Sequence, residues 1–553
     1  MGQERKFHCN IAIYFEICYY IKKCKGVTFM KLSNKITVIA LGAILILLLA
    51  ISLTNKTNKN SNNSNQNSIV DGTELYEDGF SAIVNNGQAT ITDCYLSDDN
   101  ITIPEKIEGI PVTEIGDNAL NYTICKSIEI PNSIVKIGIS AFEGAYELTS
   151  IEFPNSLIEI GERAFYNCDA LTSIKLPDSL IEIGERAFYE CDALSSIKFP
   201  DSLIEIGEQA FYNCDALASL SLPNSLISVG NESFYDCDAL TSIKLPDSLE
   251  KVGDNAFYDC DAVTDIYISK SVTELGKGAF ANLPILQSFD VDNSNNAYAA
   301  IDGVLFTKDI SELIVYPRGK TELEYVVPDS TTKIHSLAFA ENQSLKNITL
   351  PRALKEIGES CFYECKLLRS IEIPEGVTAI APFTFYGCRQ LERASIPDGV
   401  TIIDYSAFNM CELLENVSLP ASLISIGQNA FSGCYRAFDK LTIPGNVSSI
   451  GSYAFNECYF ITDVSLPKSL KEINEMAFRA CYCLNRIEIP DSVTVIGDDA
   501  FLGCGNIDKV VDSSNNQLPL ILLDTKSVTL VCNESSYAFT YANKYDINVE
   551  LRQ

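Results

Sequence analysis

Residues 177–199, PDSLIEIGERAFYECDALSSIKF, decide the fold, because the same pattern returns every 23 residues along most of the chain. A period of this length indicates stacked supersecondary units, each of which buries its apolar face only against its neighbours. The sequence therefore predicts a solenoid with its function on a long surface. A proline opens most units, and Ser269 holds the same phase in one; the prolines are Pro131, Pro154, Pro177, Pro200, Pro223, Pro246, Pro328, Pro351, Pro374, Pro397, Pro420, Pro444, Pro467 and Pro490.

Each unit is expected to wind one coil that contains a short strand. Lys198 lies between two apolar residues, and this alternation has the period of two that is typical of a strand with one outward face. The proline that follows has no N–H for a further ladder bond, so it ends the strand. The recurrent apolar positions must point inward; in this unit they are Leu180, Ile183, Ala187, Phe188, Cys191, Leu194, Ile197 and Phe199.

A glycine recurs at one point of the unit, where Gly184 lies here. Asp404 and Asn474 replace it in two later units, and these residue types tolerate a left-handed backbone. We therefore expect a positive φ at this phase, and a different local turn in the unit that carries Ala381. Residues 185–189 after the glycine are too few for an independent helix, so we expect one helical turn there.

The units follow the pattern I-G-x-x-A-F-x-x-C-x-x-L-x-x-I-x-L-P, which resembles the 23-residue repeat of BspA-like leucine-rich repeat surface proteins. The resemblance covers roughly residues 80–550. It implies a β-rich solenoid, a leucine-rich-repeat array of about 15 coils with short strands and single helical turns. One hairpin-containing insertion, with strands at residues 301–306 and 312–317, and terminal caps are expected, including a helix at residues 535–545.

One transmembrane or signal helix is expected to precede the array. The uncharged apolar run ITVIALGAILILLLAISL begins at Ile36, ends at Leu53 and follows Lys31 and Lys35. Its length favours an uncleaved anchor, with a cleaved signal as the alternative. Positive charge before the run predicts a cell-membrane protein with its repeats outside, or a secreted protein after cleavage. Translation is expected to begin at Met30, and a real upstream segment is the alternative.

The chain then divides as follows. We expect a doubtful upstream extension (residues 1–29), a signal peptide or membrane anchor (30–54), a flexible Asn/Ser-rich linker (55–78), an N-terminal cap hairpin (79–103), leucine-rich repeats (104–280), the hairpin insertion (281–327), further leucine-rich repeats (328–512) and a C-terminal cap (513–553).

Charge and composition argue against several functions. Asp and Glu outnumber Lys and Arg by 73 to 41, and a net charge of −32 repels nucleic acid. The two histidines, His8 and His335, belong to unrelated regions. There is no nucleophile elbow, metal motif or glycine-rich phosphate loop. We therefore expect no enzyme activity, no cofactor and no small-molecule substrate.

A column of cysteines occupies one repeat phase. Strands in register place successive members about 4.8 Å apart, whereas a disulfide needs β-carbons about 3.8 Å apart, so buried thiols are expected. A metal site is the alternative, for which only Cys361 with Cys365 and Cys481 with Cys483 are closely spaced. The column comprises Cys168, Cys191, Cys214, Cys237, Cys260, Cys365, Cys388, Cys411, Cys434, Cys458, Cys481 and Cys504.

Three outward ladders are candidates for binding. The strand position carries Lys175, Lys198, Ser221, Lys244 and Tyr267 before the insertion and Glu372, Ser395, Ser418, Ser465 and Glu488 after it. In leucine-rich repeats this face is the usual ligand surface, so the resemblance places a partner there, and a merely solvated face is the alternative.

Two further ladders follow the buried phenylalanines and cysteines. Tyr166, Tyr189, Tyr212, Tyr235, Tyr258, Tyr363 and Tyr386 offer rigid amphipathic contact area, or simply stiffen the array by stacking. Asp169, Asp192, Asp215, Asp238 and Asp261 are expected to bond nearby backbone N–H groups, with calcium bridging as the alternative.

Two functions from different classes remain. The resemblance implies a cell-surface binding protein that holds an unidentified protein or glycan ligand in adhesion to host, matrix or neighbouring cells. A structural spacer or envelope component without a specific ligand is the alternative. The difference between the two halves favours the first, and the near-identity of three consecutive units favours the second.

Overall fold

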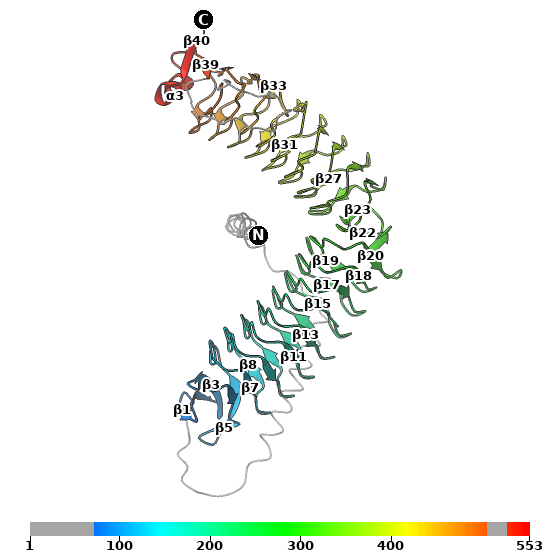
Figure 1. The fold of residues 1–553 in the computed structure, drawn as a ribbon, viewed down its shortest axis with the longest axis vertical. Coiled ribbons are helices and arrows are strands. Elements are labelled where there is room, and N and C mark those ends of the chain that lie inside the picture. Colours follow the sequence, from blue (N-terminus) through cyan, green and yellow to red (C-terminus); the bar gives the residue numbers. More distant parts are fainter. Residues whose placement is uncertain (1–70, 506–527, 553) are drawn as a thin grey trace. The chain divides into compact units, whose positions relative to one another are not determined.

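The computed structural model describes residues 71–505 and 528–552, which belong to one unit, Ile69–Gln553. This part of the chain winds as a β-solenoid of about 19 turns with little helix, and successive turns follow one another in sequence order (Figure 1). The apolar run from Ile36 to Leu53 and the upstream extension lie outside the described residues. Among the described residues, no helix is both long enough and apolar enough to cross a membrane.

An antiparallel meander opens the array. It consists of β1 (Glu74–Glu77), β2 (Phe80–Asn85) and β3 (Gln88–Cys94). The first turn joins it when β6 (Ile110–Ile115) pairs in parallel with β3 and antiparallel with β5 (Lys106–Ile107). The cap therefore has three strands and begins inside the segment that was expected to be linker up to residue 78.

Two-residue strands form a parallel ladder along one side of the solenoid. Neighbours pair in register, so that Ile183 lies opposite Ile206. After β6 the ladder contains β8 (Lys136–Ile137), β10 (Glu159–Ile160), β12 (Glu182–Ile183), β14 (Glu205–Ile206), β15 (Ser228–Val229), β17 (Lys251–Val252), β19 (Glu274–Leu275), β25 (Lys333–Ile334), β27 (Glu356–Ile357), β29 (Ala379–Ile380), β31 (Ile402–Ile403), β32 (Ser425–Ile426), β34 (Ser449–Ile450), β36 (Glu472–Ile473) and β38 (Val495–Ile496).

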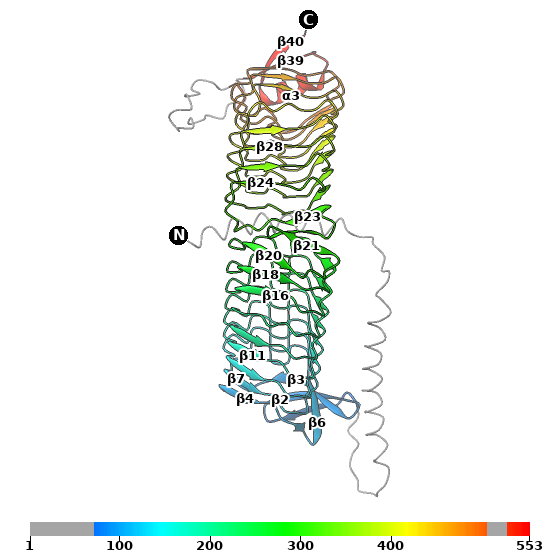
Figure 2. The same cartoon turned by 90° about the vertical axis from the view of Figure 1, so that its right-hand side faces the viewer.

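A second row of strands follows another side of the solenoid, and Figure 2 shows several of them one above another. We call its outward surface the strand face. It contains β4 (Asn100–Thr102), β7 (Ser127–Glu129), β9 (Ser150–Glu152), β11 (Ser173–Lys175), β13 (Ser196–Lys198), β16 (Ser242–Lys244), β18 (Asp265–Ile268), β20 (Ser288–Val291), β24 (Glu324–Val326), β26 (Asn347–Thr349), β28 (Ser370–Glu372), β30 (Arg393–Ser395), β33 (Lys440–Thr442), β35 (Asp463–Ser465), β37 (Arg486–Glu488), β39 (Thr529–Cys532) and β40 (Asn548–Leu551).

The number of turns exceeds the expected 15 or so. The strands β4, β20, β39 and β40 belong to turns that depart from the 23-residue spacing or lack the proline. They nevertheless pair with their neighbours as the regular turns do. Inter-strand pairing therefore continues where the sequence period is no longer visible.

Stacked phenylalanines fill the core. Ring centroids from Phe142 to Phe280 lie 5.0 to 5.7 Å apart, and those from Phe339 to Phe501 lie 5.0 to 5.8 Å apart. The leucine, isoleucine and cysteine positions of the repeat are buried around them. Apolar burial of about 25 cal/mol per Å² makes this continuous column the main stabilising term.

The segment after the repeat glycine forms hydrogen-bonded turns, which corrects the expectation of a helical turn. Tyr189 N donates to Arg186 O at 3.2 Å, whereas Arg186 N donates to Glu208 O of the next turn at 2.8 Å. Arg186 has a φ of 52°. Because this left-handed residue turns its amide toward the neighbouring coil, the backbone cannot continue as a helix.

The expectation of a positive φ at the glycine itself is wrong, because Arg186 and its equivalents, two residues later, adopt it instead. The glycine is needed for close backbone contact. A Cβ on Gly184 would lie 2.7 Å from both Ile160 O and the carbonyl carbon of Gly161 in the preceding turn.

The replacements of this glycine fit the same explanation. Where the phase carries Ala381, β27 and β29 do not pair and the ladder is interrupted. Asp404 and Asn474 keep their inter-turn bonds at 3.0 and 3.1 Å. Their polar side chains bond the backbone, since Asn474 Nδ2 donates to Ile450 O at 2.7 Å and Asp404 Oδ1 accepts from Tyr405 N at 2.7 Å. A methyl group offers no such compensation.

The insertion is a three-stranded meander of β21 (Tyr298–Ile301), β22 (Val304–Thr307) and β23 (Glu312–Val315). Asp302 and Gly303, which the sequence placed inside a strand, form its first turn with φ values of 49° and 76°. Two positive φ values suit an Asp-Gly hairpin turn. The buried residues form two core clusters that divide here, Leu305 joining the first and Phe306 the second.

The predicted terminal helix is present as α3 (Tyr537–Tyr545). Ser536 caps it, since its hydroxyl accepts from Phe539 N at 3.2 Å. Ala538, Tyr541 and Ala542 are its buried residues. The helix thus places apolar side chains at the end of the repeat core, as a solenoid cap requires.

Candidate binding surface

The strand face presents the predicted outward residues to solvent. Lys175 and Lys198 are register partners on β11 and β13, and both are exposed. Lys244 on β16 is also exposed, and its Nζ lies 5.9 Å from the ring centroid of Tyr267 on β18. Tyr267 is half-buried, and its hydroxyl donates to Asp292 Oδ2 at 3.0 Å.

These lysines remain available to a partner. Among the described residues, neither Lys175 nor Lys198 nor Lys244 makes an ion pair with a carboxylate. The neighbouring Ser221 is exposed but belongs to no strand, so the strand row is interrupted at its turn. The N-terminal half therefore carries unpaired positive charge on an otherwise acidic chain.

The C-terminal half of the strand face has a different character. Glu372 and Ser395 are register partners on β28 and β30, and Ser465 lies on β35. Glu488 on β37 forms an ion pair with Arg552, Nε to Oε1 3.0 Å. All the predicted residues of this half, Glu372, Ser395, Ser418, Ser465 and Glu488, are exposed.

A shallow groove of about 330 Å³ interrupts the strand face beside Ser418. Lys440 and Thr442 of β33 line its other side, and Phe438 lies among its lining residues. The turn that contains Ser418 lacks a strand at this position. The groove therefore marks a place where two neighbouring turns form no strand pair, although Val417 N still donates to Ala437 O at 2.9 Å.

The predicted tyrosine ladder stacks in register. Tyr166, Tyr189, Tyr212, Tyr235 and Tyr258 have neighbouring ring centroids 4.6 to 5.0 Å apart. Tyr363 and Tyr386 repeat this arrangement at 5.0 Å. Burial raises the pKa of Tyr189, Tyr212 and Tyr235 above the usual value, so the stack is neutral at physiological pH.

The structure also contains a tyrosine ladder that the sequence reasoning missed. Tyr435, Tyr459 and Tyr482 stack with centroids 4.6 and 4.8 Å apart. Each of them directly follows a cysteine of the column, a phase that carries aspartate in the first half. Aligning the units on cysteine instead of phenylalanine would have revealed it.

The aspartate phase brings carboxylates close together. One carboxylate oxygen from each of Asp215, Asp236 and Asp238 lies within 4.8 Å of the others. Near them, burial and the neighbouring Asp261 raise the pKa of Asp259 to about 6. Asn282 Nδ2 donates to Asp259 Oδ1 at 2.6 Å. The crowding therefore has an energetic cost, which a cross-turn amide partly offsets.

The cysteine column lies inside the solenoid. Cys191 is fully buried, and its Sγ–H donates to Phe165 O at 3.2 Å. Cys214 and Cys237 make the equivalent bond to the phenylalanine carbonyl of the preceding turn, at 3.2 and 3.3 Å. Burial raises the pKa of Cys191 to about 12. These thiols act as small apolar residues with one weak hydrogen bond.

Comparison with known proteins supports the repeat assignment. The family model described as "BspA type Leucine rich repeat region" matches residues 113–217, 181–302, 319–437 and 401–518. No curated protein matches the chain.

Two solved structures are similar to this chain. A leucine rich cell surface protein from Faecalibacterium prausnitzii is 26% identical, with a TM-score of 0.51, over 71% of this chain and 94% of its own. A leucine-rich repeat protein from Eubacterium ventriosum is 22% identical, with a TM-score of 0.50, over 80% of this chain and 97% of its own. The second likeness concerns the fold alone.

Proposed function

This chain belongs to the BspA-type leucine-rich repeat family, and from that premise we propose that it is a non-catalytic cell-surface protein whose strand face binds a macromolecular partner. The partner is a protein or a glycan. The similarity to a protein named as a leucine rich cell surface protein supports the location. Residues from Ile36 to Leu53 would supply the membrane anchor.

The observation that carries the proposal is the unpaired charge of Lys175, Lys198 and Lys244. A lysine that serves only solubility gains from nearby carboxylates, and these are abundant in a chain of net charge −32. The three exposed lysines lie together on the strand face, in the N-terminal half of the array. They complement acidic groups on a partner, and such complementarity sets association rate and specificity.

The test is binding of the protein to an array of matrix proteins and glycans. Reversing charge at two positions, Lys198→Glu and Lys244→Glu, should weaken capture at least tenfold and reduce its dependence on salt. Arg393→Glu with Lys440→Glu is the matched control, because it makes the same change in net charge at two exposed strand residues of the other half. Equal loss in both variants would show that net charge, not this surface, governs capture.

One observation favours the spacer function instead. The turns that begin at Pro154, Pro177 and Pro200 are nearly identical, and Glu159, Glu182 and Glu205 lie in register along them. A surface that repeats without variation suits a spacer, which holds other parts of the chain away from the membrane, better than it suits selective binding of one ligand. Failure of the protein to bind any member of the array would favour this second function.

A further inference from the structure

Backbone hydrogen bonding between turns is interrupted where the insertion leaves the array. In the turn before the break, Asn255 N donates to Lys277 O and Phe257 N donates to Ala279 O, both at 2.9 Å. One period later, the amides of Gly278 and Phe280 make no hydrogen bond with any described residue. Every preceding turn pairs these two N–H donors with carbonyls of the next turn. At the break, both donors are therefore without an acceptor among the described residues.

The second half of the array satisfies its own backbone instead. Tyr316 N, just after β23, donates to Ala338 O at 2.8 Å, and Tyr316 stacks on Phe339 with centroids 5.1 Å apart. Leu313 of β23 lies in register with Ile334 of β25. The meander thus starts a new ladder with the second half of the array. It does not offer backbone carbonyls to the N–H groups of Gly278 and Phe280.

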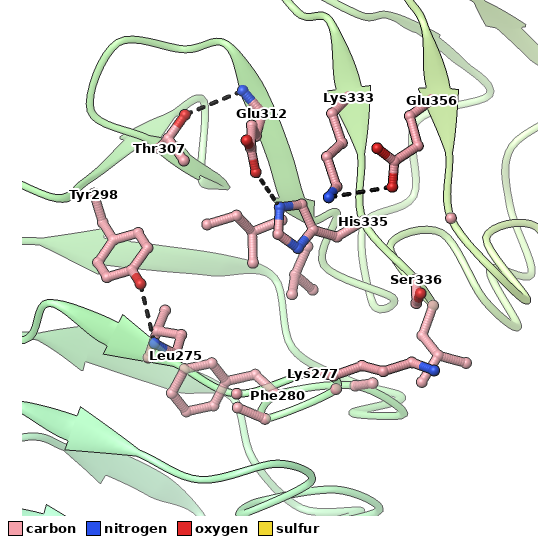
Figure 3. Close-up of a pocket in the computed structure, with 18 residues that line it drawn as sticks. Leu275, Lys277, Phe280, Tyr298, Thr307, Glu312, Lys333, His335, Ser336 and Glu356 are labelled. Atoms are coloured by element: carbon pink, nitrogen blue, oxygen red, sulfur yellow. Dashed lines mark hydrogen bonds and ion pairs between the residues drawn. The ribbon is translucent and has the colours of Figure 1, made fainter. Parts of the chain in front are cut away.

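A side chain covers the open edge of β19. The hydroxyl of Tyr298 accepts from Leu275 N at 3.0 Å and donates to Thr273 O at 3.2 Å, as Figure 3 shows for Leu275. These are backbone groups that a next strand would otherwise bond. The edge strand is satisfied in this way, whereas the amides of Gly278 and Phe280 are not.

Gly278 and Phe280 are among the residues that line a cavity of about 350 Å³. Figure 3 shows Leu275, Lys277 and Phe280 on one side of it and Glu312 with His335 on the other. Ile314 adds an apolar side chain. This volume is at the lower end of the range of small-molecule sites, which combine apolar walls with a few fixed polar groups.

The charges around the cavity are paired with one another. His335 Nε2 lies 2.6 Å from Glu312 Oε2, and Lys333 Nζ lies 3.1 Å from Glu356 Oε1. Lys277, the other lysine of the lining, reaches Glu359 across the break at 2.9 Å. Each carboxylate of the lining therefore has a basic partner, and the amide donors remain the groups in need of an acceptor.

We propose that this cavity binds a small organic carboxylate with an apolar body. The carboxylate oxygens accept from the N–H groups of Gly278 and Phe280, while the body packs against Leu275 and Ile314. Buried backbone N–H groups are nearly always paired, and a carboxylate is a strong acceptor for adjacent amides. This site is independent of macromolecular binding on the strand face.

Benzoate is the probe, and its neutral amide benzamide is the control. In protein labelled with 15N-glycine and 15N-phenylalanine, millimolar benzoate should shift the amide resonances of Gly278 and Phe280, and benzamide should shift them at least fivefold less. Unchanged resonances, or equal shifts with both compounds, would overturn the proposal without any variant.

A blocking variant tests the location. Ile314→Trp places a larger side chain in the cavity and should abolish the benzoate shifts. The matched variant Ile424→Trp adds the same side chain at an exposed position outside the lining and should leave them unchanged. Benzoate shifts that persist in folded Ile314→Trp would place the binding site elsewhere.

Discussion

Two substitutions in one turn separate the two reasons for which a solenoid needs glycine. Gly358 occupies the repeat phase at which backbones of neighbouring turns approach each other. A Cβ there would lie 2.6 Å from the carbonyl carbon of His335. Overpacking of this kind costs about 1–3 kcal/mol, and the stiffer unfolded chain offsets about 0.4–1 kcal/mol of it. Gly358→Ala should therefore destabilise the protein by about 1–2 kcal/mol.

Two residues later the expected sign reverses. Ser360 has a φ of 55°, and its hydroxyl makes no hydrogen bond with the rest of the described chain. A left-handed conformation costs an L-residue about 1–2 kcal/mol, while glycine loses about 0.5–1 kcal/mol of extra chain entropy on folding. Ser360→Gly should be neutral or stabilising by up to about 1 kcal/mol.

Urea unfolding followed by circular dichroism measures both changes, with midpoints compared at equal slope. The expected result is a lower midpoint for Gly358→Ala and an equal or higher one for Ser360→Gly. A stable Gly358→Ala protein together with a destabilised Ser360→Gly protein would refute the close-contact explanation. That result would instead support the interpretation that the repeat position of Gly358 carries glycine because it needs a positive φ.

The carboxyl of Asp259 should make the parent protein less stable as the pH rises, and Asp259→Asn should remove this contribution. The carboxyl has its pKa raised to about 6, so the folded state binds the proton more tightly and stability falls as pH rises from about 4 to 6. After allowance for partial exposure this loss is about 1–2 kcal/mol, and thermal melts at pH 4 and 7 should show a smaller loss in the variant than in the parent protein, because burial also raises the pKa of Asp169, Glu182 and Glu190. Within residues 71–505 and 528–552, native thiols should react slowly with a thiol reagent except at the partly exposed Cys94 and Cys483, and rapid labelling of the whole column would contradict its burial. Since the core divides at Leu305, hydrogen exchange should show two blocks of different protection; one uniform block would contradict the division.

Much of the fold follows from local patterns. Alternation around Lys198 and the recurrence of apolar residues predicted which side chains are buried, because burial in a stacked array depends on phase alone. The strand-face residues were located in the same way. A repeat of this kind gives many independent copies of one signal, so an error at one position does not change the interpretation of the others.

The failures concern relations between turns. Gly184 was assigned a positive φ because glycine serves both left-handed turns and close contacts, and a single sequence does not distinguish them. Asp302 with Gly303 was placed inside a strand, although this pair suits a tight hairpin turn. The tyrosines from Tyr435 onward were missed because the ladder changes phase. The cavity was missed because it depends on hydrogen bonds between segments far apart in sequence.

Both openings described above coincide with departures from the period of 23. The distance from Ser269 to Pro328 is 59 residues, and the cavity lies there; Pro420 and Pro444 are 24 residues apart, and the groove beside Ser418 lies there. A coil of unequal length cannot align all its backbone donors with its neighbour. The irregular turns at these two places form concave spaces, and the one at the insertion also leaves the amides of Gly278 and Phe280 without a partner among the described residues. In an array whose repeats were copied, insertions are therefore a direct route from a uniform surface to a specific site.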